Sequence, residues 1–267
     1  STHSFTLFPY TTLFRSTIQK IMNNPFSLSG KTILVTGASS GIGRGIAIAC
    51  AGMGAQLILT GRNITRLQET LSTLEGEGHS YIAADLTNAQ ERTALVEQLP
   101  ALHGVVHCAG VGSRVPCKML TQEDIDHVLK PNTEAPILLQ AELLAEKKIQ
   151  KESSVVFIAS AAATMPSMGN AVYSASKAAI IAYAKCLALE LAPRKIRVNC
   201  ISPTMVWTDL ISESLSEQQL KDAESNYPLK RFGTPEDIAY LTVYMLSETS
   251  IWMTGSNVEI TGGSQVG

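Results

Sequence analysis

Tyr173 and Lys177 are the residues of this sequence best suited to moving a proton. They are four residues apart, so on a helix they lie on the same face. A free tyrosine has a pKa of about 10, and a neighbouring ammonium favours the phenolate. Tyr173 could therefore act as a general acid when a carbonyl is reduced, or as a general base when an alcohol is oxidised. By itself the four-residue spacing is weak evidence for a catalytic pair, because a tyrosine and a lysine also occur at this spacing by chance.

Ser160 makes the pair more specific. It ends a run of β-branched and apolar residues, 154–160, and precedes Tyr173 by thirteen residues. The carboxyl ends of parallel strands border the crevice in which α/β proteins bind ligands. There the Ser160 hydroxyl would hold a substrate oxygen and stabilise the charge that develops on it.

Short β-branched runs alternate with longer amphipathic stretches from Lys31 onward, which is the pattern of βαβ units. We predict a Rossmann-like, doubly wound sheet of seven parallel strands in a single α/β domain, residues 22–267. No internal repeat or Pro/Gly-rich linker divides it. The predicted strands cover residues 31–36, 55–60, 80–84, 104–109, 154–160, 196–201 and 256–260. The predicted helices begin near Ile42, Asn63, Asn88, Thr121, Ala171, Ser216 and Pro235.

Residues 1–21 are treated as a leader outside this domain. The stretch 6–16, TLFPYTTLFRS, looks like the translation of a sequencing-adapter oligonucleotide, which would make it a gene-assembly artefact. The alternative is a disordered natural leader. We expect Met22 to be the native start and expect no secretory signal, because a basic start and a continuous apolar core are lacking.

A glycine-rich turn follows the first predicted strand and opens a helix. It reads TGASSGIG over residues 36–43. Small residues let the backbone approach a pyrophosphate, and the first N–H groups of the helix point at it. Glycines also end strands for structural reasons, but this position fits a dinucleotide-binding turn. The cofactor-binding residues expected here are Gly37, Ser39, Ser40, Gly41, Ile42, Gly43 and Arg44.

The TGxxxGxG spacing of this turn resembles the short-chain dehydrogenase/reductase family, and the resemblance extends over residues 28–263. The family's catalytic residues correspond to Ser160, Tyr173, Lys177 and Asn132, the last of which anchors a water near the lysine. For Asn132 a mere helix irregularity next to Pro131 is the alternative. The resemblance also implies further cofactor contacts. Asp85 and Leu86 would contact the adenine, and Ala109 and Gly110 would allow close backbone approach. Pro203, Val206 and Thr208 would contact the nicotinamide, and the cofactor would also contact Tyr173 and Lys177, the latter at the nicotinamide ribose.

The end of the second predicted strand favours NADP(H) over NAD(H). A carboxylate there would accept hydrogen bonds from a free ribose 2′-hydroxyl, but the sequence has Thr60-Gly61-Arg62. A guanidinium suits a 2′-phosphate, and Arg44 could supply a second positive charge. Both arginines could instead be solvated surface residues.

Two positions depart from the family pattern. Its NNAG motif after strand four is replaced by the stretch His107-Cys108-Ala109-Gly110, so two asparagines that brace the sheet are absent. We expect His107 to be a packed core residue rather than a ligand. Thr204 stands where the family has a glycine, which removes easy access to positive φ.

Substrate identity is expected to come from two segments, residues 161–170 and 205–227, the second as a mobile lid. An apolar pocket there would favour a hydrophobic ketone, a steroid-like alcohol or a β-ketoacyl chain. The alternative is that the apolar side chains of these segments do not contact a substrate and serve only to pack the lid against the rest of the domain. The candidates are Met165, Met168, Met205, Trp207, Leu210, Leu215 and Tyr227.

The predicted helix 171–192 carries few charges and is apolar on more than one face, so it needs cover on both sides. We expect a homo-oligomer, a tetramer or a dimer, in which a twin subunit covers one side. An alanine-rich helix buried within a single monomer is the alternative.

Composition excludes several other classes. With 21 basic and 23 acidic residues the net charge is −2, which argues against a nucleic-acid partner. The five cysteines show no metal-ligand spacing and their odd count argues against a disulfide framework, so no metal and a reducing cytoplasm are expected. The longest uncharged stretch, 153–176, is interrupted by Pro166 and Gly169, so no membrane span is expected.

These features together predict an NADP(H)-dependent oxidoreductase that moves a hydride between nicotinamide and a ketone or secondary alcohol. A sugar-nucleotide epimerase or dehydratase shares Tyr-xxx-Lys, but has the spacing TGxxGxxG and a larger C-terminal region. An NADP-binding scaffold or sensor without turnover typically loses the tyrosine or the lysine. Both residues are present here.

Overall fold

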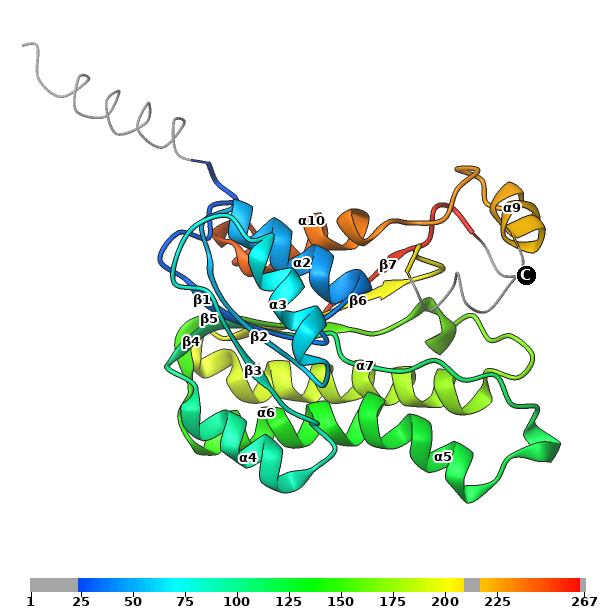
Figure 1. Cartoon of the computed structure of the whole chain (residues 1–267), viewed down its shortest axis with the longest axis horizontal. Helices are drawn as coiled ribbons and strands as arrows, with labels where there is room; N and C mark the ends of the chain where they lie inside the picture. Colours follow the sequence, from blue (N-terminus) through cyan, green and yellow to red (C-terminus); the bar gives the residue numbers. More distant parts are fainter. Residues whose placement is uncertain (1–23, 209–216, 265–267) are drawn as a thin grey trace, which may run out of the picture.

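The computed structural model describes residues 24–208 and 217–264, and these form a single parallel sheet with helices on both sides (Figure 1). Its order is β3-β2-β1-β4-β5-β6-β7, so the second half of the sheet starts beside β1. This confirms the predicted seven-stranded, doubly wound α/β domain. The strands are β1 (Thr32–Thr36), β2 (Gln56–Gly61), β3 (Ser80–Ala83), β4 (Leu102–His107), β5 (Ile149–Ile158), β6 (Arg197–Pro203) and β7 (Asn257–Ile260).

Helices cover the two faces of the sheet as separate layers (Figure 1). One layer consists of α2 (Gly41–Gly52), α3 (Ile64–Ser72) and α10 (Pro235–Leu246). The other consists of α4 (Ala89–Gln98), α5 (Gln122–Leu129), α6 (Ala135–Ala145) and α7 (Ala171–Leu191). A further helix, α9 (Glu217–Ser225), lies outside both layers.

The core lies in two hydrophobic clusters, one on each face of the sheet. Neighbouring residues of β1 show the division, because Leu34 belongs to one cluster and Ile33 and Val35 belong to the other. Side chains of a strand point alternately to its two faces. A parallel sheet that is covered on both faces therefore needs apolar residues at successive positions, as β1 has.

Polar side chains begin several of the helices. The Asn63 side chain accepts the backbone N–H of Arg66 at α3, and the Asn88 side chain accepts two backbone N–H groups at α4. Thr121 and Thr234 form capping boxes at α5 and α10. These caps explain why the predicted helix starts near Asn63, Asn88 and Thr121 agree with the structure. The predicted start at Ser216 lies outside the described residues.

β5 is longer than predicted. It begins at Ile149 rather than at Ser154, and its pairing with β4 shifts register between Leu102 and Gly104. Glu152, in the additional part of β5, has a φ of 63°. Because the irregular part of β5 has no period-two alternation of apolar residues, the periodicity of the sequence does not reveal it.

α5 and α6 are joined without a loop by a π-helical turn, η2 (Lys130–Glu134). Within it the backbone N–H of Ala135 bonds the carbonyl of Lys130, five residues earlier. Pro131 lies within this turn and Pro136 follows it in α6, and neither has a backbone N–H to donate. The π-helical turn thus lies where some of the i to i−4 hydrogen bonds of an α-helix cannot form.

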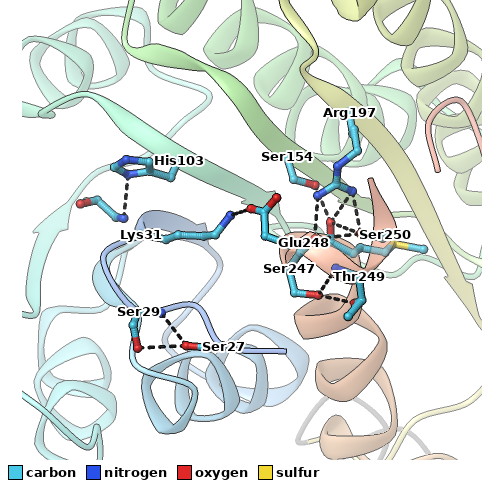
Figure 2. A network of polar contacts seen from close by, with 12 residues as sticks. Ser27, Ser29, Lys31, His103, Ser154, Arg197, Ser247, Glu248, Thr249 and Ser250 are labelled. Carbon is cyan, nitrogen blue, oxygen red and sulfur yellow. Dashed lines mark hydrogen bonds and ion pairs between the residues drawn. The ribbon is translucent and has the colours of Figure 1, made fainter. Parts of the chain in front are cut away.

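Arg197 organises the amino edge of the sheet (Figure 2). It begins β6 and is 8% exposed. Its guanidinium donates to the carbonyls of Met245 and Ser247 and to the hydroxyl of Ser250, at 2.7, 3.1 and 2.7 Å. Met245 and Ser247 end α10, so a buried positive charge lies where the helix leaves its last carbonyls unpaired. The neighbouring pair of Lys31 and Glu248 ties the start of β1 to the same region (Figure 2).

One stretch of the described residues, Ala171–Arg194, is long and apolar enough to cross a membrane, judged by length and composition only. It comprises α7 and the short turn η4 (Ala192–Arg194). In the structure α7 packs beside β6 and carries core residues such as Ile180 and Leu187.

Candidate active site

Ser160, Tyr173 and Lys177 lie at the carboxyl edge of the sheet. Ser160 follows β5 in extended conformation, and its hydroxyl accepts the backbone N–H of Ala162 at 3.1 Å, which starts the short turn η3 (Ala161–Ala163). Tyr173 and Lys177 lie near the start of α7. The Lys177 ammonium is 3.0 Å from the carbonyl oxygen of Ile158, the last residue of β5. It lies 5.9 Å from the centre of the Tyr173 ring.

Lys177 is buried, with 6% of its surface exposed. Its ammonium makes no ion pair with a carboxylate among residues 24–208 and 217–264. The Ile158 carbonyl is neutral and does not cancel the charge of the buried ammonium. That charge can therefore act on neighbouring groups. Tyr173, by contrast, is half-buried, so its hydroxyl can face a ligand.

Asn132 is positioned by the π-helical turn and is 2% exposed. Its Oδ1 accepts the backbone N–H of Val111 at 2.7 Å, and its Nδ2 donates to the carbonyl of Val111 at 2.9 Å. Nδ2 also lies 3.2 Å from the hydroxyl of Ser176, which precedes Lys177. The helix irregularity that was the alternative for this position is present in the structure. Within it, both ends of the Asn132 side-chain amide are hydrogen-bonded.

Gly110 brings these groups together. A Cβ atom built on Gly110 would lie 3.0 Å from Oδ1 of Asn132 and 3.5 Å from Nζ of Lys177. A Cβ atom would therefore crowd the Asn132 amide and make ordinary contact with Lys177. The structure therefore gathers the chain after β4, the π-helical turn and α7 at one point beside β5.

The glycine turn has the conformation that its residues predict. Gly37 and Gly41 have positive φ, of 66° and 51°. A Cβ on Gly37 would lie 2.8 Å from Cα of Ala109, and a Cβ on Gly43 would lie 2.2 Å from the carbonyl oxygen of Gly37. Two of the three glycines are thus required by the packing of the turn itself, in addition to any approach by a ligand.

The first turn of α2 lacks a side-chain cap. Ser40 is its N-cap residue but makes no side-chain capping bond, in contrast to the N-caps of α3, α4, α5 and α10. Ile42 packs against the core and holds the helix in place. The uncapped N–H groups and the positive end of the helix dipole are what a phosphate needs.

Arg62 and Ser39 border the end of β2. A Cβ on Gly61 would lie 3.5 Å from the Ser39 hydroxyl, and Arg62 is exposed. Arg62 is also close enough to Asp85 to act on its charge. Burial raises the pKa of Asp85, but hydrogen bonds from Thr87 and the charge of Arg62 outweigh it and hold the pKa below its ordinary value.

Arg44 is bonded mainly within the protein. Its guanidinium donates to the Thr70 hydroxyl at 3.0 Å, to the carbonyl of Ser39 at 2.8 Å and to Glu69 at 3.3 Å. It therefore ties the glycine turn to α3. Of the two predicted arginines, Arg62 has its guanidinium more open to a ligand.

Asp85 and Leu86 follow β3, as predicted. The Asp85 carboxylate accepts the Thr87 backbone N–H at 2.9 Å, which shapes the turn before α4, while Leu86 is buried in the core. Ala109 lies at the switch point between β1 and β4. There the Thr36 hydroxyl accepts the backbone N–H groups of Cys108 and Ala109, both at 3.0 Å.

The segment after β6 lies over the glycine turn. Pro203 ends β6, and Val206 forms an isolated bridge with Gly233. A Cβ on Gly41 would lie 2.9 Å from the Thr208 methyl carbon. Thr204 is not among the described non-glycine residues with positive φ, so the loss of the family's glycine there causes no backbone strain.

His107 is a core residue in the structure. It is 4% exposed, its ring stacks on Phe157 at 4.5 Å, and its Nε2 lies 3.0 Å from the side-chain oxygen of Gln140. Burial lowers its pKa to about 4, although the bond to Gln140 opposes this. At neutral pH the ring is therefore uncharged.

The candidate substrate residues divide into different environments. Met168 is 97% exposed, Met165 and Met205 are half-buried, and Leu210 and Leu215 lie outside the described residues. Trp207 and Tyr227 both pack against Phe232. The centre of the Phe232 ring is 5.4 Å from that of Trp207 and 5.3 Å from that of Tyr227. Sequence reasoning missed Phe232 and also missed Glu224, which bonds to Trp207.

Comparison with known proteins places this arrangement in a family. A family model described as enoyl-(acyl carrier protein) reductase matches residues 37–265. The chain is 34% identical over 245 residues to L-xylulose reductase of Caenorhabditis elegans, covering 89% of this chain and 97% of that protein. It is 32% identical over 237 residues to a 3-oxoacyl-(acyl-carrier-protein) reductase of Rickettsia prowazekii, covering 88% and 97%. A solved short-chain dehydrogenase/reductase from Brucella melitensis, described as glucose/ribitol dehydrogenase, has a TM-score of 0.84 and 29% identity, covering 90% of this chain and 98% of that one.

The fold and the relatives define an oxidoreductase built on a doubly wound, dinucleotide-binding sheet. The chain belongs to the short-chain dehydrogenase/reductase family. Members of this family use nicotinamide cofactors and act on small molecules that carry a hydroxyl or ketone group.

Proposed function

We propose that this protein is an NADP(H)-dependent oxidoreductase that interconverts a ketone and a secondary alcohol. The observation that carries the proposal is the position of the Lys177 ammonium, 3.0 Å from the carbonyl of Ile158 and 5.9 Å from the centre of the Tyr173 ring. A buried positive charge beside a phenol favours the phenolate. This is the arrangement that a tyrosine needs for proton transfer near neutral pH.

Each catalytic side chain has one task in this proposal. Tyr173 gives a proton to the oxygen of the reduced carbonyl, or takes it from the alcohol in the reverse direction. Ser160 donates a hydrogen bond to the same oxygen and stabilises its developing charge. Lys177 places its positive charge beside the phenol and holds the nicotinamide ribose.

Asn132 contributes through its backbone. Pro136 lies four residues after Asn132 and has no N–H, so the ordinary helical bond to the Asn132 carbonyl is not formed. That carbonyl is available to anchor a water, while the side-chain amide is used entirely for Val111 and Ser176. Through such a water Lys177 can exchange a proton with solvent.

The described residues fit a bound dinucleotide. The turn at Gly37 and Gly41 and the uncapped start of α2 provide the backbone surface that a pyrophosphate requires. Arg62 and Ser39 would hold a 2′-phosphate, and Asp85 with the backbone at Leu86 would hold the adenine. When bound, the cofactor supplies or accepts the hydride. Ala109, Gly110, Pro203, Val206 and Thr208 would border its nicotinamide end.

The substrate is proposed to be apolar. Trp207, Tyr227 and Phe232 form an aromatic cluster beside the catalytic edge, which favours a hydrophobic ketone, a steroid or a β-ketoacyl thioester over a free sugar. The test is a panel of these compounds assayed by NADPH absorbance. An enoyl thioester and L-xylulose belong in the panel, because the family model and one relative are named for related substrates. Binding of NADPH without reduction of any carbonyl would instead favour a scaffold or sensor.

We further propose a homo-oligomer in a reducing compartment. Leu189 on α7 is 79% exposed and Leu138 on α6 is 44% exposed, so a second copy of the chain could cover this face. All five cysteines are unpaired. Sedimentation of the purified protein distinguishes a tetramer, a dimer and a monomer.

A further inference from the structure

Glu224 connects three segments that border the catalytic edge. It lies on α9, and its Oε1 accepts the indole N–H of Trp207 at 2.7 Å. The same oxygen accepts the backbone N–H of Phe232 at 3.1 Å. One carboxylate oxygen therefore joins the segment that leaves β6 to the segment that enters α10. Hydrogen bonds to an ionised acceptor are shorter and stronger than neutral ones.

Aromatic packing supports this junction. Phe232 is 1% exposed and contacts the rings of both Trp207 and Tyr227. The Tyr227 hydroxyl accepts the backbone N–H of Met205 at 3.3 Å. The position of Trp207 is thus defined by an apolar contact on one side and by Glu224 on its polar edge.

The junction reaches the glycine turn through Thr208. The Trp207 backbone N–H donates to the carbonyl of Gly233 at 2.8 Å, and the Gly233 N–H donates to Met205 at 3.0 Å. Thr208 follows directly, and its methyl carbon would lie 2.9 Å from a Cβ on Gly41. The place of Thr208 against the glycine turn therefore depends on how Trp207 is held.

We propose that Glu224 is a positioning residue for the cofactor. It holds Trp207 so that Thr208 stays against the glycine turn and borders the nicotinamide end of the dinucleotide. This inference rests on the proposed function and adds a residue outside the catalytic set. Glu224 acts through Trp207 and touches neither the cofactor nor the substrate.

Kinetic measurements on two Glu224 variants separate positioning from simple stabilisation. Glu224→Ala removes both hydrogen bonds, and we expect the KM for NADPH to rise about tenfold, the scale of losing an ordinary hydrogen bond. Glu224→Gln should remain close to the wild type, because its amide oxygen still accepts both N–H groups. Asp222→Ala is the matched control, since Asp222 is exposed on the same helix and, within the described part of the chain, its carboxylate accepts a hydrogen bond from Gln218 of α9. A purely structural role would lower the melting temperature of Glu224→Ala and leave the KM unchanged.

Fluorescence tests the same inference without turnover. The chain has two tryptophans, and Trp252 is 100% exposed, so Trp252→Phe leaves Trp207 as the single reporter. In that background NADPH should quench Trp207 by energy transfer. Adding Glu224→Ala should shift the emission of the cofactor-free protein toward that of a hydrated indole and weaken the quenching at a given NADPH concentration.

The two hypotheses fail in different ways. An inactive wild type whose Trp207 still responds to NADPH, with the response weakened by Glu224→Ala, contradicts the proposed turnover and supports the role of Glu224. An active wild type whose KM and fluorescence are unaffected by Glu224→Ala overturns the role of Glu224 alone. A Glu224→Gln variant as impaired as Glu224→Ala overturns it too.

Discussion

Asn132 pairs with the backbone of Val111 through both ends of its side-chain amide, accepting the N–H at 2.7 Å and donating to the carbonyl at 2.9 Å. A single residue thus fixes the chain after β4 relative to the π-helical turn. Gly110 precedes Val111, and a Cβ there would approach Lys177 within 3.5 Å. The amide pairing consequently sets the surroundings of the lysine, and because Pro136 has no N–H, the Asn132 carbonyl lacks its ordinary helical bond.

Pro136→Ala tests the role of that carbonyl. Alanine provides an N–H that can bond the Asn132 carbonyl, and we expect kcat to fall roughly five- to tenfold, the value of one hydrogen bond. The melting temperature should not fall, because alanine favours a helix more than proline does. Pro193→Ala, in the short turn after α7, controls for the general effect of removing a proline. Unchanged kcat in Pro136→Ala would argue against a proton path through this carbonyl.

Tyr173→Phe tests the general acid. Removing the phenol oxygen should lower kcat by at least about a hundredfold, the scale of acid–base catalysis. NADPH binding should be nearly intact, because the ring and Lys177 remain in place. Turnover is followed by NADPH absorbance and binding by fluorescence titration. If the variant keeps its turnover, Tyr173 is not the proton donor.

Arg62→Ala tests the cofactor preference. The variant should bind NADPH roughly ten- to hundredfold more weakly, as expected for losing hydrogen bonds between a guanidinium and a phosphate. The KM for NADH, measured on the same preparation, is the internal control and should change little. Equal losses for the two cofactors would contradict the NADP(H) assignment.

His107→Asn tests the origin of acid sensitivity. The His107 pKa is about 4 in the folded protein against 6.5 ordinarily, so between these values the unfolded chain binds the additional proton. The free energy of unfolding therefore falls as the pH drops from about 6.5 to about 4, by about 3 kcal/mol in all. Asparagine does not titrate, so urea unfolding at pH 7 and pH 5 should differ less in the variant. His103 also has a lowered pKa and is present in both proteins, so it cancels. If the free energy of unfolding depends on pH equally in the wild type and the variant, His107 is not the origin of the acid sensitivity.

The sequence was sufficient for the existence of the seven strands and for most helix starts, because local chemistry determines them, but not for the irregular first part of β5. Asn63, Asn88 and Thr121 are N-cap residues whose side chains accept backbone N–H groups nearby in the chain. Continuous apolar runs identify strands that are covered on both faces. Both signals are short-range and are readable from the order of residues.

Other features depend on contacts between distant segments, and these were not predicted. Glu224 and Phe232 are ordinary residues until folding brings Trp207 beside them. Arg44 has the charge for a phosphate, but its bonds to Ser39, Thr70 and Glu69 are set by how α3 packs on α2. The π-helical turn did have a local signal, since Pro131 and Pro136 lie on either side of Asn132.

The Arg197 network lies at the amino edge of the sheet, whereas Tyr173 and Lys177 lie at the carboxyl edge. The hydrogen bonds that join β6 to the end of α10 and the side chains proposed for catalysis therefore lie at opposite ends of the parallel sheet. Substitutions around Ser247 and Ser250 can therefore change the packing of β6 against α10 without touching the proposed catalytic side chains. For the same reason, attachment to a solid support through the amino edge would turn the carboxyl edge, with Tyr173 and Lys177, away from the support.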